Sequence, residues 1–213
     1  MVYIGPGQAS NEAAILQNCI GSMRYIEFMD GLGEVIDLRE VDKSKVFVGG
    51  LDANEGHGDY AYLWQDDVMQ VIFHIATLMP NHEKDPQCNK KKLHIGNDFV
   101  CMVYNNSGQR YEMGTLKGQF IYVCVIIVPL DQGSNKVWIE CRKELDPLLG
   151  HFREPKIVSD RNLSTMVRQL ALHCNLASHI HHSMANKGAG TGPYASNWLE
   201  RLRAIRRLKQ KLI

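Results

Sequence analysis

The sequence predicts an α/β fold in which a central β-sheet is flanked by helices. Segments with the apolar content of strands alternate along the chain with segments that repeat their apolar residues at the helical period. The segment 120–128 is apolar at every position, as expected for a strand that is covered on both faces. With 213 residues, of which 45% are hydrophobic, the chain is long enough to bury such a core.

The N-terminal part of the chain predicts two helices followed by short strands. We expect helices over 10–20 and 22–32, because Ser22 can cap the second helix and Gly33 ends it. Short apolar segments bounded by glycines and polar turns then predict three strands, over 34–38, 45–48 and 60–64.

The clearest helical pattern lies between Asp66 and Pro80. Acidic residues at its start suit the positive end of a helix dipole, and the proline ends it. Its apolar residues form one stripe at helical spacing: Val68, Val71, Ile72, Ile75, Leu78 and Met79. We therefore expect a helix here, and a shorter one that begins at Asp85-Pro86 and ends near Gly96.

The rest of the chain again alternates between strands and helices. Strands are predicted over 99–104, 120–128 and 136–141. A long amphipathic helix is expected over roughly 161–184. After a glycine-rich loop, a last helix that is rich in basic residues is expected over about 195–212.

The composition excludes several classes of protein. The formal net charge of +1 excludes a chain that is basic as a whole, and we expect no nucleic-acid partner. No apolar run approaches the roughly 20 residues of a membrane-spanning helix, and the N-terminus lacks the features of a signal peptide. The six scattered cysteines are typical of reduced thiols in a cytoplasmic protein. We interpret the chain as a domain of a longer protein.

Motifs for autonomous chemistry are missing from the sequence. Neither GxxxxGK[ST] nor a GxGxxG between a strand and a helix occurs, so we predict no nucleotide-hydrolysing site of its own. His179 and His182 have the i,i+3 spacing of helical metal ligands, but no third ligand is evident, and we predict no metal site. There is no GxSxG elbow, and a cysteine–histidine pair formed in space stays an open alternative.

The most distinctive segment runs from Lys90 to Asp98 and joins three lysines to a His-Ile-Gly-Asn-Asp sequence. Lysines suit the negative end of a helix dipole, and glycine, asparagine and aspartate are common where a helix ends. On these grounds alone, we interpret the segment as a helix end with solvated polar side chains.

The same segment resembles the catalytic helix of the Rap-type GTPase-activating proteins. Gly50-Leu51-Asp52 and the glycine-bearing loop after it are similar to the family's upstream motif, and residues 71–80 are similar to the helix before the catalytic one. Five further segments resemble the tuberin-type branch of the family: 3–8, 97–105, 114–130, 157–163 and 198–212. The resemblance implies one Rap-GAP-like domain over 1–213, with a central mixed β-sheet flanked by helices.

The resemblance also implies a mode of action. The family inserts an asparagine carboxamide, the asparagine thumb, into the nucleotide site of a small GTPase, and Asn97 is the matching position. His94 matches a supporting residue, and the positions expected to contact the GTPase are Lys91, Lys92 and Asp98. The implied GTPase is Rheb, which itself holds GTP and Mg²⁺, so we expect no cofactor of the domain's own. A hamartin-like subunit is the implied partner in a full-length complex.

An amide side chain suits this role, because it offers a donor and an acceptor but cannot take a proton as a base. Its contribution is therefore positioning and electrostatics. The resemblance assigns structural support to Gly96 and Asn105, and an asparagine at the end of a strand can brace a turn through its side chain. The sequence departs from its relatives at Leu93, where they carry a basic residue directly before the histidine.

The basic last helix has two interpretations. Its arginines and lysines form either a solvated face or a surface for an acidic partner, namely the GTPase, calmodulin or an anionic membrane. Arg201 and Arg203 lie nearest the folded body and are the candidates for GTPase contact. We expect a cytoplasmic protein that is recruited to the lysosomal or vacuolar membrane surface.

Three hypotheses of function follow. The first is a domain that activates a Rheb-like GTPase by supplying Asn97 in trans. The second is a non-catalytic module that binds a GTPase or calmodulin on the same fold, and substoichiometric turnover separates it from the first. The third is a hydrolase with a small-molecule substrate of its own, which no residue spacing supports.

Overall fold

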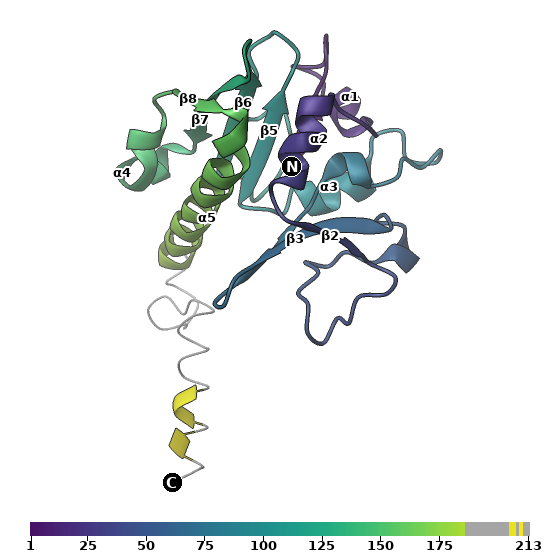
Figure 1. The fold of residues 1–213 in the computed structure, drawn as a ribbon, viewed down its shortest axis with the longest axis vertical. Coiled ribbons are helices and arrows are strands. Elements are labelled where there is room, and N and C mark those ends of the chain that lie inside the picture. Colours follow the sequence, from purple (N-terminus) through teal and green to yellow (C-terminus); the bar gives the residue numbers. More distant parts are fainter. Residues whose placement is uncertain (186–204, 208, 211–213) are drawn as a thin grey trace.

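Two β-sheets form the framework of the protein (Figure 1). The computed structural model describes residues 1–185, 205–207 and 209–210. Within these residues, five strands form a mixed sheet in the order β1-β5-β6-β7-β8, and three strands form an antiparallel sheet in the order β2-β3-β4. The predicted α/β class, with a central mixed sheet flanked by helices, is therefore confirmed.

The larger sheet combines a parallel half with an antiparallel half. Its strands are β1 (Val2–Ile4), β5 (Val100–Asn105), β6 (Val123–Pro129), β7 (Ser134–Cys141) and β8 (Lys156–Ser159). Strands β1, β5 and β6 run parallel, whereas β7 and β8 are antiparallel to their neighbours. The three strands predicted for this region are confirmed as β5, β6 and β7, and β1 and β8 were not predicted.

The central strand β6 is buried on both faces, as its continuous apolar sequence predicted. Val125 and Ile127 point into one hydrophobic core, and Cys124 and Ile126 point into another on the opposite face. The helices are α1 (Glu12–Leu16), α2 (Met23–Asp30), α3 (Asn89–Ile95), α4 (Asp146–Leu149) and α5 (Asp160–Ala185).

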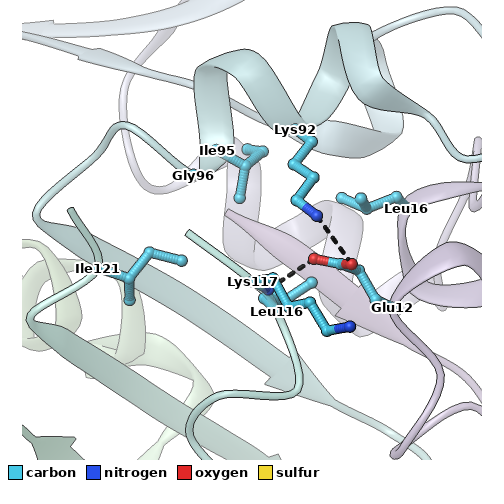
Figure 2. A pocket seen from close by; sticks show the side chains of 8 residues that line it. All are labelled: Glu12, Leu16, Lys92, Ile95, Gly96, Leu116, Lys117 and Ile121. Atoms are coloured by element: carbon cyan, nitrogen blue, oxygen red, sulfur yellow. Dashed lines mark hydrogen bonds and ion pairs between the residues drawn. The ribbon is translucent and has the colours of Figure 1, made fainter. Parts of the chain in front are cut away.

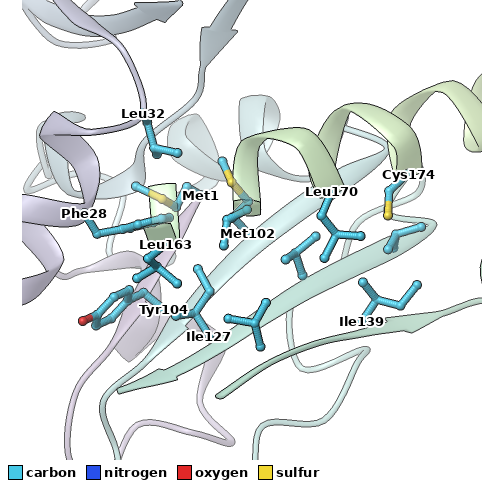
Figure 3. Close-up of a cluster of buried hydrophobic side chains, with 14 of the residues drawn as sticks. Met1, Phe28, Leu32, Met102, Tyr104, Ile127, Ile139, Leu163, Leu170 and Cys174 are labelled. Carbon is cyan, nitrogen blue, oxygen red and sulfur yellow. The ribbon is translucent and has the colours of Figure 1, made fainter. Parts of the chain in front are cut away.

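Helices α2 and α5 cover the first face of the sheet, and helices α1 and α3 contribute to the second core. Figure 3 shows Leu163, Leu170 and Cys174 of α5 above Ile127 and Ile139 of the sheet. Because both faces are packed in this way, α3 is held against a rigid support. The long helix predicted over 161–184 is confirmed as α5.

The smaller sheet corrects the prediction of a helix between Asp66 and Pro80. This segment forms strand β4 (Gln70–Phe73), which pairs with β3 (Tyr60–Gln65), and a short 3₁₀ turn, η2 (Ala76–Leu78). One carboxylate oxygen of Asp66 accepts the backbone N–H groups of Val68 and Met69, both at 2.8 Å, and thereby reverses the chain. The acidic residue therefore begins a hairpin turn instead of a helix.

Further differences concern short elements. Strand β2 (Glu34–Asp37) is present, but residues 45–48 have an irregular backbone after a turn instead of the predicted strand. The remaining 3₁₀ turns are η1 (Ala53–Glu55), η3 (Lys143–Leu145) and η4 (Gly150–Phe152). The six cysteines are free thiols. Among the described helices, none is long and apolar enough to cross a membrane.

Candidate functional site

Helix α3 carries the His-Ile-Gly-Asn-Asp segment and ends in a turn that exposes Asn97. Gly96 caps the helix, and the backbone N–H of Asn97 donates to the His94 carbonyl at 3.2 Å. The Asn97 side chain is exposed, and within the described part of the chain it makes no side-chain hydrogen bond. Its amide hydrogens and its carbonyl oxygen are therefore free to meet a partner molecule.

Two glycines in close contact fix the turn before Asn97. A Cβ on Gly118 would lie 2.7 Å from the Gly96 carbonyl oxygen and 2.8 Å from the Gly96 Cα, and both atoms belong to the backbone. The Gly96 carbonyl also accepts the backbone N–H of Phe120 at 3.3 Å. The end of α3 therefore rests directly on the chain that leads into β6.

An acidic side chain from α1 reinforces this contact. The Glu12 carboxylate binds the ammonium of Lys92 at 3.0 Å and accepts the backbone N–H of Lys117 at 2.6 Å. Figure 2 shows the carboxylate between these two partners, beside the apolar side chains of Ile95 and Leu116. Glu12 thus joins three separate parts of the chain around the end of α3.

Three histidines pack together on the buried side of α3. His94 is 8% exposed, and its ring lies edge-on to those of His57 at 4.3 Å and His74 at 5.2 Å between centroids. Burial, together with the two neighbouring histidines, lowers the pKa of His94 to about 4. The ring is therefore neutral near pH 7, and it supports the turn by packing rather than by charge.

Asp98, the residue after Asn97, is half-buried. Its carboxylate lies 3.0 Å from Nδ1 of His74, which belongs to the segment between β4 and η2. Asp98 is thus engaged within the domain. Phe99 follows and packs its ring against Phe120 and against His179 of α5, so the chain after Asn97 is anchored from two sides.

A match to known sequences decides the family. The sequence profile described as Rap/Ran-GAP matches residues 15–207. The chain belongs to this family.

Two relatives show which members of the Rap/Ran-GAP family this domain is similar to. The tuberous sclerosis 2 protein homolog of Schizosaccharomyces pombe is 39% identical over 99% of this chain, which spans 16% of that relative. The Ral GTPase-activating protein subunit alpha-1 of Homo sapiens is 31% identical over 82% of this chain, which spans 8% of it. The chain thus corresponds to a small part of each of these longer proteins.

A solved structure agrees with these sequence matches. The structure described as the TSC2 GAP domain superposes with a TM-score of 0.74 and is 37% identical, covering 83% of this chain and 93% of that one. The resemblance to the tuberin-type GAP domain is therefore confirmed.

The placement of Lys91 within this GAP domain contradicts its expected contact with a GTPase. Lys91 is 2% exposed, and its ammonium donates to the Leu16 carbonyl at 2.8 Å. Burial lowers the pKa of this lysine. The helical period explains the position, because Lys91 lies four residues before the buried Ile95 and shares its face of α3. Lys92 is half-buried and paired with Glu12.

Asn105 lies at the end of β5 and is 2% exposed. Its side-chain oxygen accepts the backbone N–H of Ser107 at 3.1 Å and the Ser107 hydroxyl at 2.6 Å, and its amide donates to the Gln109 carbonyl at 2.7 Å. The side chain therefore braces the turn after β5, and it is not available to a partner.

Two sets of residues singled out from the sequence remain: the possible metal ligands and the basic residues of the predicted last helix. His179 and His182 pack against Phe99, and no group of three metal-ligating side chains occurs in the described part of the chain. Arg201 and Arg203, with most of the predicted last helix, lie outside the described residues. The helical residues 205–207 are exposed.

Sequence reasoning missed Glu12, His57, His74 and Gly118, which support the turn from outside α3. Three of them lie within segments that resemble the family: His57 in the loop after Gly50-Leu51-Asp52, His74 in 71–80 and Gly118 in 114–130. The resemblance gave these residues no role, and each of the four meets α3 through a contact between residues far apart in the sequence.

Proposed function

We propose that this Rap/Ran-GAP domain accelerates GTP hydrolysis by a small GTPase and that Asn97 supplies its carboxamide in trans. The observation that carries the proposal is an exposed carboxamide without an internal partner, on a turn that is braced from several sides. A polar side chain that is free yet held in place is suited to a ligand outside its own domain.

The chemistry available to Asn97 limits its role. A small GTPase already binds the nucleotide and Mg²⁺, and its slow step requires an oriented water and stabilisation of charge on the phosphate. The carboxamide oxygen can accept a hydrogen bond from that water, while the amide can donate to a phosphate oxygen. Because an amide does not act as a base, Asn97 acts by positioning and electrostatics.

The exposed face of α3 offers a surface for the GTPase. Lys90 and Leu93 are three residues apart on α3, a spacing that brings them to one face of the helix that ends before Asn97. Both are exposed, Leu93 to 60%, and the exposed Lys117 lies on the neighbouring segment. A cationic rim suits a partner that presents phosphate groups and carboxylates.

Rheb is the GTPase that the tuberin-type resemblance favours, and GTP and Mg²⁺ enter with it. A hamartin-like subunit would belong to the longer protein, and the basic C-terminal segment is the candidate for contact with calmodulin or an anionic membrane at the lysosomal or vacuolar surface. These partners rest on the resemblance and on sequence charge.

The test measures GTP hydrolysis by Rheb and by Ras, Rap and Rho-type GTPases, with the domain present at a substoichiometric concentration. We expect selective acceleration of Rheb through many turnovers. Acceleration of another GTPase would retain the activity but change the partner. A well-folded domain that accelerates none of them would contradict the proposal and leave a non-catalytic binding module as the better account.

A further inference from the structure

The imidazole of His74 bridges two parts of the chain beside the turn that carries Asn97. Its Nδ1 atom lies 3.0 Å from each carboxylate oxygen of Asp98, and its Nε2 atom lies 3.0 Å from the Gly49 carbonyl oxygen. The ring is largely enclosed, with 11% of the side chain exposed. One side chain therefore connects the segment after β4, the loop at Gly49 and the turn after α3.

The loop at Gly49 is shaped to receive this ring. Gly49 has φ +60°, and a Cβ there would lie 2.8 Å from Nε2 of His74 and 2.7 Å from a methyl carbon of Ile72. A side chain at position 49 would therefore displace the imidazole as well as strain the backbone. The backbone that His74 contacts thus directly precedes the Gly-Leu-Asp motif.

Both ring nitrogens of His74 face oxygen atoms that accept hydrogen bonds. A neutral imidazole has one N–H and can satisfy one of these acceptors, whereas the imidazolium donates to both. The neighbouring His94 ring is neutral near pH 7 and does not compete for the Asp98 charge.

We propose that His74 is a positioning residue that fixes the Asn97 turn by holding Asp98 against the Gly49 loop. Asp98 directly follows Asn97, so its side-chain tether limits how far the carboxamide-bearing turn can rotate or shift. A misplacement of about 1 Å in a catalytic group can cost about 100-fold in rate. The effect on hydrolysis rests on the proposed function, whereas the effect on the turn does not.

The first measurement needs no GTPase. Hydrogen exchange of backbone amides is compared between the parent domain and His74→Gln, which keeps a polar side chain but cannot donate to both acceptors. We expect exchange at residues 97–99 to be about tenfold faster, because the hydrogen bond that holds Asp98 to His74 is lost. Exchange in β6 should stay unchanged. Unchanged exchange at 97–99 would overturn the proposal, whatever the domain does to a GTPase.

The second measurement separates positioning from a general loss of structure. For His74→Gln we expect a GTP hydrolysis rate at saturation about 10- to 100-fold lower, with the GTPase concentration at half-saturation unchanged. Asp98→Asn should lose a similar factor, and the double variant should lose no more than either single variant, because the two groups act as a unit. His173→Gln, an exposed histidine on α5, is the matched control. Additive losses in the double variant would overturn the proposed coupling.

Discussion

Replacing Gly118 by alanine is predicted to displace the turn that carries Asn97. The new Cβ would lie 2.8 Å from the Gly96 Cα and 2.7 Å from the Gly96 carbonyl oxygen. The φ angle of Gly118 lies outside the left-handed region, so the alanine is strained by contact alone. A third neighbour, the Ile121 side chain at 2.8 Å, can rotate away, but the two Gly96 atoms belong to the backbone and cannot, so one of the two segments must move.

The size of the displacement follows from contact distances. Carbon atoms in contact are normally at least about 3.5 Å apart, so a 2.8 Å approach requires a shift of about 0.7 Å. Overpacking of this kind costs about 1–3 kcal/mol of folding stability. For a chain of this length, that lowers the melting temperature by roughly 2–12 °C. A shift of most of an ångström at Asn97 should also lower the stimulated hydrolysis rate about 10- to 100-fold.

Two assays on the same protein check this prediction: thermal unfolding, and GTP hydrolysis with the domain at saturating concentration. Gly150→Ala is the matched control, because a Cβ there meets nothing within 4 Å and φ is −54°. The control should keep the parent's stability and activity. A Gly118→Ala domain that melts and stimulates hydrolysis like the parent would refute the argument that the glycine contact sets the position of Asn97.

Two further predictions follow from the buried groups of α3. Lys91→Met should leave the binding free energy for the GTPase within about 0.5 kcal/mol of the parent, because the side chain is buried. Titration of the domain with the GTPase measures this affinity. Weaker binding by a normally folded variant would show that Lys91 contacts the partner. Because the pKa of His94 falls from 6.5 to about 4 on folding, the unfolded chain binds more protons between these values, and stability should decline as the pH falls through this window. Urea unfolding at a series of pH values should show that the free energy of unfolding falls less steeply with pH in His94→Gln than in the parent. Equal slopes for the two proteins would contradict the lowered pKa of His94.

The sequence located the elements whose signals are local. Strand β6 was predictable because all its positions are apolar, and α5 because its apolar residues keep one helical period over many turns. The end of α3 near Gly96 was also predictable, since the glycine and the polar residues after it mark a helix end.

The segment 66–79 shows where local reasoning fails. Its valines and isoleucines fit a helical stripe, but Val71 and Ile72 also pair well on a strand, and the side chain of Asp66 starts a turn. The competing patterns were decided by pairing with β3, a contact that a single segment does not specify.

The candidate site also combines residues with a local sequence signal and residues without one. Asn97 was predicted through the motif that contains it, whereas Glu12 and His74 reach the turn at Asn97 from segments that lie far away in the sequence. The burial of Lys91 was not predictable from the run Lys90-Lys91-Lys92, because a run of charges is typical of an exposed surface. Its spacing from Ile95 was the signal that favoured an inward position.

The central claim is that the Asn97 carboxamide accelerates hydrolysis in trans, and one comparison tests it most directly. The rate of GTP hydrolysis by the loaded GTPase is measured at saturating domain for the parent, Asn97→Ala and the control Asn175→Ala, an exposed asparagine on α5. Binding of each domain is measured in parallel. We predict that Asn97→Ala binds like the parent and lowers the rate at least about 100-fold, as loss of a transition-state donor does. An Asn97→Ala domain that stimulates hydrolysis as well as the parent would contradict the account.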